Sequence, residues 1–213
     1  AKLIDEITYD EMLEMSSSGA GVLMARSVEF GRRYNVPIIV KSTFTNNKGT
    51  VVKEKTMEEA IVSGVTHNDK EVKFTLFGVP DQPGIAGTVF GSLSEIGTNV
   101  DMIVQNVSKE SITDISFTAP SEQQKDVEDT LKNISKQLDA KGYDVDENIA
   151  RISIIGAGMK SESGVASKMF KTLGDNKINI SMISTSPIRV SCVISSNDIE
   201  KALNVLHEEF ITN

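Results

Sequence analysis

The stretch of this sequence best suited to chemistry is the short loop DQPG, residues 81–84, which leads into a predicted helix. A helix N-terminus offers free backbone N–H groups and the positive end of the helix dipole, which together bind a carboxylate or a phosphate. Gly84 leaves room for a ligand to approach the backbone, and Asp81 could hold an ammonium group. This combination suits an α-amino acid, although Asp81 could equally be a helix cap or an Asx-turn residue in a plain tight connection.

The same region occurs twice in the chain. Residues 164–183 align with residues 84–103 without a gap, and the identical pairs are Gly84/Gly164, Ala86/Ala166, Phe90/Phe170, Leu93/Leu173, Asn99/Asn179, Met102/Met182 and Ile103/Ile183. The second loop, GAGMKSESG, is two residues longer, lacks the aligned aspartate and offers Ser161, Glu162 and Ser163 instead. Two copies are too few for a solenoid, so we predict tandem small domains whose two sites need not prefer the same ligand.

Polar residues also recur where strands are predicted to begin and end. Asn99 and Asn179 stand at matching strand starts, where each could hydrogen-bond a ligand or simply tolerate an irregular turn. Gln105 and Asn106 end one predicted strand, and residues 184–186 (Ser-Thr-Ser) occupy the corresponding place in the second copy. These side chains are candidate ligand contacts from the strand side.

The elements around the first loop follow a β-α-β-β-α-β order, which is typical of the ferredoxin-like class. The predicted strands and helices of this copy are 71–78, 85–95, 99–107, 112–118, 122–140 with Gly142 as its cap, and 143–145. The second copy, 151–156, 164–173, 179–184, 189–194 and 197–210, leaves too few residues for a fourth strand. A spare strand at 60–67 is predicted to complete it, which makes the chain α+β with the first domain inserted in the second.

Residues 1–55 follow a different pattern. They predict a helix at 7–15 with Thr8 or Asp10 as N-cap, a helix at 22–34, a buried strand at 37–43, a turn at 45–49 and a strand at 50–52. Two helices and these strands cannot bury both of their faces, so we interpret the segment as the end of a larger α/β domain.

Composition excludes several classes of protein. The net charge of −8 argues against nucleic-acid binding, and no apolar run approaches the length of a membrane span. One cysteine, Cys192, and two separated histidines form neither a disulfide nor a zinc site. We find no catalytic motif and expect an acidic cytoplasmic protein without a metal.

Several blocks of the sequence strongly resemble aspartokinase, and together they cover nearly all 213 residues in the order of that family. They are EMLEMSSSGAGVLMARSVEFGRRYNVPIIVKSTF, GVPDQPGIAGTVFGSL, NVDMIVQNVS, TDISFT, GAGMKSESGVASKMF, INISMISTS and ALNVLHEEF. The resemblance implies a kinase domain that phosphorylates the β-carboxylate of aspartate with ATP, followed by two ACT domains that bind end-product amino acids and inhibit the kinase. Residues 1–55 would be the end of the kinase domain, 70–147 the first ACT domain, and 57–69 with 148–213 the second.

By the same resemblance, the expected effectors are threonine and lysine, bound between the first and second ACT domains. The first site would use Asp81, Gly84, Ile85, Ala86 and Gln105, closed by Asn179 and Ile180. The second site would use Met159, Ser161, Gly164, Val165 and Ala166, closed by Asn99 and Val100.

The family's phosphate-binding motif and aspartate-binding region have no counterpart here. We therefore expect the chain alone to be inactive, with ATP and Mg required only by the complete kinase, and to be a fragment or a natural regulatory subunit. We also expect a homodimer through the ACT domains, with the missing kinase half as a further partner. The alternative is a structural dimerisation module that binds no effector.

Overall fold

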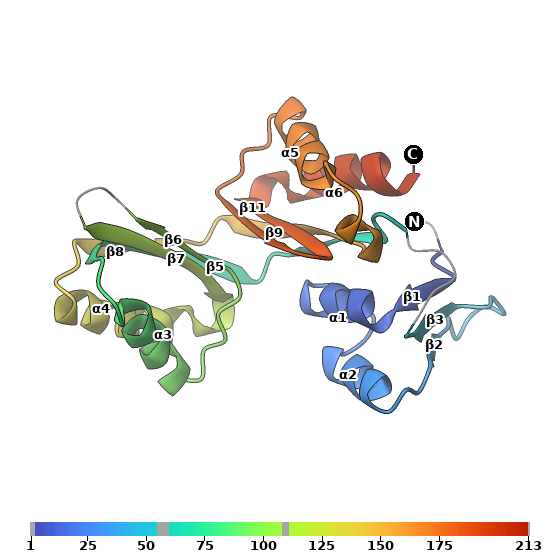
Figure 1. Ribbon diagram of the computed structural model, residues 1–213, viewed down its shortest axis with the longest axis horizontal. Helices are drawn as coiled ribbons and strands as arrows, with labels where there is room; N and C mark the ends of the chain where they lie inside the picture. Colours follow the sequence, from blue (N-terminus) through green and yellow to red (C-terminus); the bar gives the residue numbers. More distant parts are fainter. Residues whose placement is uncertain (1–2, 55–59, 108–110, 213) are drawn as a thin grey trace. The chain divides into compact units, whose positions relative to one another are not determined.

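The computed structural model describes residues 3–54, 60–107 and 111–212 and divides the chain into two compact units (Figure 1). One unit joins Ala1–Asn68 to Arg151–Asn213, and the other is Asp69–Ala150. The predicted linker at 53–59 falls largely outside the described residues. No helix in the described part of the chain is long and apolar enough to cross a lipid bilayer.

The N-terminal segment contains β1 (Glu6–Thr8), α1 (Tyr9–Ser17), α2 (Ala25–Arg33), β2 (Ile38–Val40) and β3 (Thr50–Lys53). Its small sheet has the order β1-β3-β2, with β1 parallel and β2 antiparallel to β3. Thr8 caps α1 in a capping box with Glu11, so of the two predicted N-caps, Thr8 and Asp10, the first is confirmed.

Three predictions for the N-terminal segment are wrong in part. Strand β1 was not predicted, because three residues paired with a strand more than 40 positions away leave no local pattern. Helix α2 begins at Ala25 rather than Val22, since residues 19–24 form turns and a connection. The strand expected to be buried at 37–43 is only Ile38–Val40, and Ile39 is 58% exposed because it points to the face opposite Ile38 and Val40, which pack against the core.

The inner domain is made of β5 (Glu71–Pro80), α3 (Ile85–Glu95), β6 (Ile103–Val107), β7 (Ile112–Pro120), α4 (Gln124–Gln137) and β8 (Gly142–Asp146). Its antiparallel sheet has the order β6-β7-β5-β8, and α3 and α4 lie together on one face (Figure 1). The core between sheet and helices contains Phe74 and Phe117, whose rings stack 5.4 Å apart, with Phe90 from α3 edge-on to Phe117.

The outer domain is made of β4 (Gly64–Asn68), β9 (Ile149–Ile155), α5 (Val165–Asp175), β10 (Met182–Ser186), β11 (Arg189–Ser195) and α6 (Ile199–His207), followed by a π turn at Glu208–Thr212. Its sheet has the order β10-β11-β9-β4. Because β4 precedes the inner domain and pairs with β9 after it, the inner domain is inserted in the outer one. The predicted fold class, two ferredoxin-like domains with the first inserted in the second, is confirmed.

All seven residues of β9 are buried, and those that pair with β4, Arg151–Ile155, face helices on both sides of the outer sheet. Ile152 and Ile154 belong to the core formed with α5 and α6. Ile155 instead joins the cluster that contains Met12 and Met15 of α1. Strand β9 therefore contributes to two hydrophobic cores, one with α5 and α6 and one with α1 of the N-terminal segment.

Some predicted boundaries within the two domains are also wrong. The strands expected to start at Asn99 and Asn179 start at Ile103 and Met182, where pairing with β7 and β11 begins. The strand expected from Ala60 starts at Gly64. Gly142 is the first residue of β8 rather than a helix cap, and Asp139 adopts the left-handed conformation after α4 with φ 52°.

Candidate ligand-binding loops

The first loop opens α3 without a side-chain cap. Gly84 is the N-cap residue in the left-handed conformation, with φ 95°, and no side chain accepts a hydrogen bond from the first turn. The N–H of Ile85 donates to the Gln82 carbonyl at 3.3 Å, whereas no acceptor in the described part of the chain meets the N–H groups of Ala86 and Gly87. An exposed, uncapped helix start without acidic residues is suited to bind a carboxylate.

Asp81 serves neither of its purely structural alternatives. Its backbone N–H donates to the Ser111 carbonyl at 2.9 Å, but Gly84 takes the N-cap position. Within the described residues, the exposed carboxylate of Asp81 makes no hydrogen bond or ion pair, so no Asx turn forms. The side chain is therefore available to a cationic group.

The second loop opens α5 with the same backbone geometry. Gly164 has φ 94°, and α5 starts at Val165 without a side-chain cap or an acidic residue in its first turn. Within the described residues, the first N–H group of this helix with an acceptor is that of Lys168, which donates to the Gly164 carbonyl at 2.9 Å. The two residues that lengthen this loop are accommodated by a 3-10 turn at Ala157–Lys160, which contains Met159, and Ser161 Oγ donates to the Gly158 carbonyl at 3.2 Å.

Strand register identifies the residue of the outer domain that corresponds to Gln105. Gln105 pairs with Ile115, a core residue on the helix-covered face, so Gln105 points to the side of α3. At the matching position, Thr185 pairs with Val190, which belongs to the core beneath α5. Register therefore selects Thr185 from the three candidates at 184–186, and the 80-residue offset of the repeat was the sequence signal that could have singled it out.

The structure does not bring all predicted site residues into one loop. Asn99 and Val100 follow the C-terminal end of α3, and Asn179 and Ile180 follow that of α5. An eleven-residue helix is about 16 Å long, so Asn99 lies far from Gly84 along α3, as Asn179 does from Gly164 along α5. Closure of each loop by residues of the other domain stays a prediction.

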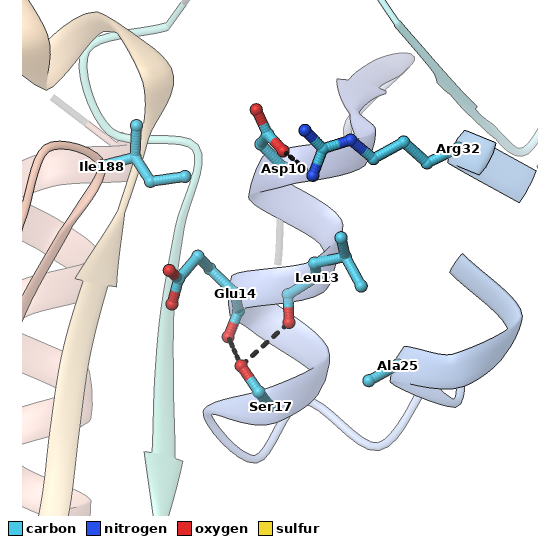
Figure 2. A pocket seen from close by; sticks show the side chains of 7 residues that line it. All are labelled: Asp10, Leu13, Glu14, Ser17, Ala25, Arg32 and Ile188. Atoms are coloured by element: carbon cyan, nitrogen blue, oxygen red, sulfur yellow. Dashed lines mark hydrogen bonds and ion pairs between the residues drawn. The ribbon is translucent and has the colours of Figure 1, made fainter. Parts of the chain in front are cut away.

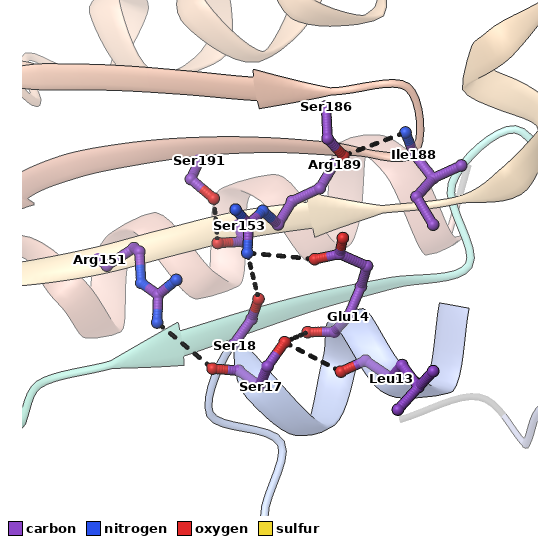
Figure 3. Close-up of polar contacts among 10 residues, drawn as sticks. All are labelled: Leu13, Glu14, Ser17, Ser18, Arg151, Ser153, Ser186, Ile188, Arg189 and Ser191. Carbon is purple, nitrogen blue, oxygen red and sulfur yellow. Dashed lines mark hydrogen bonds and ion pairs between the residues drawn. The ribbon is translucent and has the colours of Figure 1, made fainter. Parts of the chain in front are cut away.

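Helix α1 is attached to the outer domain at both of its ends. At its start, the buried carboxylate of Glu11 accepts hydrogen bonds from Ser63 Oγ and the Ala157 N–H. At its end, Arg151 donates to the Ser17 carbonyl at 3.5 Å, and Arg189 lies 3.1 Å from the Glu14 carboxylate (Figure 3). Guanidinium groups at a helix C-terminus complement the negative end of the helix dipole.

A cavity of about 270 Å³ lies beside this attachment, and Figure 2 shows the side chains that line it. The lining residues come from α1, α2 and the connection between β10 and β11, and they are Asp10, Leu13, Glu14, Ser17, Ala25, Arg32 and Ile188. Asp10 and Arg32 form an ion pair of 2.8 Å across it. None of the residues predicted for ligand binding reaches this cavity.

Cys192 lies in the middle of β11 with no exposed surface, and burial raises the pKa of its thiol to about 12. Since the thiolate is the reactive species, we expect the native protein to resist an aromatic disulfide reagent at pH 8. The same reagent should label the chain quickly in urea. Rapid labelling of folded protein would contradict the packing of β11.

Two family models described as ACT domain match residues 73–139 and 152–210. An aspartate kinase of Pseudomonas fluorescens (strain SBW25) is 45% identical over 99% of this chain and 52% of its own length. The chain thus spans about half the length of the curated relatives that it matches.

Two solved structures are similar along the chain. The regulatory subunit of aspartate kinase from Thermus thermophilus, in its ligand-free form, is 35% identical and matches 70% of this chain and 99% of that one, with a TM-score of 0.67. The aspartate kinase of Synechocystis is 37% identical over 99% of this chain and 39% of that one, with a TM-score of 0.72. The chain belongs to the aspartokinase family, in which it corresponds to the C-terminal part with two regulatory ACT domains.

Proposed function

We propose that this chain senses amino acids for an aspartokinase and binds threonine, lysine or both at its two ACT loops. The observation that carries the proposal is the pair of uncapped helix starts at Ile85 and Val165, each preceded by a left-handed glycine. The free N–H groups of each helix would hold the effector carboxylate. Asp81 would hold the effector ammonium group in the first loop, and the exposed Glu162 offers a different carboxylate in the second.

The proposed sites combine residues of both ACT domains. The first consists of Asp81, Gly84, Ile85, Ala86 and Gln105, closed by Asn179 and Ile180. The second consists of Met159, Ser161, Gly164, Val165 and Ala166, with Thr185 added and with Asn99 and Val100 closing it. Support comes from the equal backbone geometry at both glycines and from the matching register of Gln105 and Thr185.

We further propose domain limits of 70–147 for the first ACT domain, and 57–69 with 148–213 for the second. Residues 1–55 would be the end of a kinase domain that phosphorylates the β-carboxylate of aspartate with ATP and Mg. Large apolar side chains exposed on this segment support its being part of a larger domain, and they are Val22, Met24, Phe30, Tyr34, Ile39 and Phe44. The chain alone should show no ATP-dependent phosphorylation of aspartate.

A second candidate function, a dimerisation module, is favoured by the edge strands. Ile103 on β6 and Ile183 on β10 are 48% and 44% exposed at matching positions of the repeat. Each strand is at the edge of its sheet, where unpaired backbone groups can pair with another chain. A homodimer is compatible with effector binding, so the two functions differ only in whether the loops take a ligand.

Isothermal titration with L-threonine and L-lysine, separately and then each in the presence of the other, tests the proposal. Saturable binding of either amino acid would support the sensor, and mutual enhancement would indicate concerted regulation. If folded protein gave no heat with either ligand, only the dimerisation function would remain.

Asp81→Ala is expected to weaken binding of the amino acid at the first loop by about tenfold or more, because a charge-assisted contact to the ammonium group is lost. The fold should be unaffected, since the Asp81 side chain is exposed and makes no hydrogen bond or ion pair within the described residues. Titration calorimetry measures the effect. The matched control is Asp129→Ala, an exposed aspartate on α4, and equal affinities for both variants would remove Asp81 from the site.

A further inference from the structure

The carboxylate of Glu11 belongs to two parts of the molecule at once. Oε2 accepts hydrogen bonds from the Thr8 N–H at 3.1 Å and from Thr8 Oγ1 at 2.6 Å, which completes the capping box of α1. Oε1 accepts from Ser63 Oγ at 2.5 Å and from the Ala157 N–H at 2.9 Å, both in the outer domain's part of the chain. Glu11 is only 3% exposed, so these four donors provide its solvation.

Ala157 is the first residue of the loop that leads to α5. It opens the 3-10 turn that contains Met159, and Ser161 N–H closes this turn on the Gly158 carbonyl at 3.2 Å. The start of the turn is also held from the other side, where the Gly158 N–H donates to the Ala60 carbonyl at 3.1 Å. A displacement of the second loop therefore lengthens or breaks the hydrogen bond between the Ala157 N–H and Glu11.

No neutral side chain can replace this carboxylate. The two hydroxyl partners can reverse their roles, but the Thr8 and Ala157 backbone N–H groups are donors only, and each needs its own oxygen. A glutamine would turn its NH₂ group towards one of them. Only the carboxylate therefore satisfies the start of α1 and the start of the second loop at the same time.

The charge of Glu11 reinforces this dependence. Burial raises the pKa of Glu11, but the hydrogen bonds from Ser63, Thr8 and Ala157 outweigh it and hold the pKa below its ordinary value. The carboxylate is therefore ionised at neutral pH. A buried anion that loses one donor attracts water or moves towards its remaining donors, which disturbs the capping box.

We infer that Glu11 is a positioning residue that couples the second loop, residues 156–164, to helix α1 of the N-terminal segment. Amino-acid binding at the start of α5 immobilises the loop, keeps the Ala157 N–H on Glu11 and makes opening of the first turn of α1 rarer. This inference rests on the proposed function, because it requires a ligand at the second loop. It assigns a route by which the outer ACT domain can act on the segment next to it.

Amide hydrogen exchange of the full 213-residue chain tests the coupling. With saturating L-lysine or L-threonine, peptides that cover Tyr9–Met15 should exchange about fivefold more slowly in the wild type, the lower end of usual allosteric couplings. Glu11→Gln should abolish this response but still bind the ligand, with affinity reduced by at most about fivefold, because the coupling factor is the same in both directions. Asp10→Asn, the neighbouring carboxylate at the half-exposed Arg32 ion pair, is the matched control and should respond as the wild type does.

Ser63→Ala is the second variant, since it removes one donor from Glu11 without changing α1. It should at least halve the ligand-induced slowing, so the coupling can be judged even if Glu11→Gln does not fold. Binding by calorimetry without any change in α1 of the wild type, or an unchanged response in both variants, would overturn the coupling alone. Absence of binding by either amino acid would overturn the proposed function and the coupling with it.

Discussion

Phe117→Ala is expected to lower the free energy of unfolding of the inner ACT domain by about 3 to 5 kcal/mol. Phe117 has no exposed surface, stacks on Phe74 and receives the edge of the Phe90 ring. The truncated side chain would leave a cavity between the central strands and α3, and the three-ring cluster could not close around it because its members come from different elements.

Hydrogen exchange in increasing urea, read on peptides of β5 and β7, measures this loss domain by domain. The exchange midpoint of the outer domain should be preserved, since its hydrophobic core is a cluster of its own. Phe77→Ala is the matched control, because Phe77 lies on β5 but is 39% exposed, and it should cost about 1 kcal/mol or less. Equal losses in the two variants would mean that the aromatic cluster does not stabilise this domain.

Glu11→Gln is expected to destabilise the unit that contains α1 and the outer domain by about 2 to 3 kcal/mol at pH 7. The substitution removes a buried charged acceptor and leaves one backbone N–H facing the new NH₂ group. Asp10→Asn should cost at most about 1 kcal/mol, because both side chains of the Asp10–Arg32 pair are about half exposed. Denaturant unfolding of the two variants at equal pH gives the comparison.

The difference between wild type and Glu11→Gln should depend on pH in a defined direction. The pKa of Glu11 in the folded protein lies below its ordinary value of 4.5, so its stabilising effect is complete above that pH. The effect is lost as the pH falls through the folded-state pKa, where the wild-type carboxyl becomes protonated. The two unfolding free energies should therefore converge in acid, and a constant difference would contradict ionisation of Glu11.

Sequence could predict the loops and most of the helices because their signals are local. The left-handed conformations at Gly84 and Gly164 were predictable from glycines at repeated helix starts, and α3 covers the residues that its apolar spacing indicated. Thr8 as a cap follows from a threonine three residues before a glutamate.

The features that sequence missed depend on distant partners. Ser63 lies 52 positions and Ala157 lies 146 positions from Glu11 along the chain. No local pattern therefore indicates that the Glu11 carboxylate binds both of them. Asn99 was predicted to start a strand, but backbone hydrogen bonding to β7 begins at Asp101 and strand β6 itself begins at Ile103. Sequence left Ser184, Thr185 and Ser186 as equal candidates, and only the strand register assigns Thr185 to the helix side.

The insertion of the inner domain also bears on the order in which the chain folds. Asn68 is the last residue of β4 that pairs with β9 and Arg151 is the first residue of β9 that pairs with β4, so residues 69–150 form a loop that the outer sheet must close. Closing so long a loop as an open coil would be slow, because non-local contacts form only after the chain entropy is lost. Once β5 and β8 have paired at Lys73 and Asp146, the ends of that loop are already held together. During synthesis, β4 therefore stays unpaired until the inner domain has been made and has folded. Its pairing with β9 then closes only a short effective loop, as in a β-hairpin.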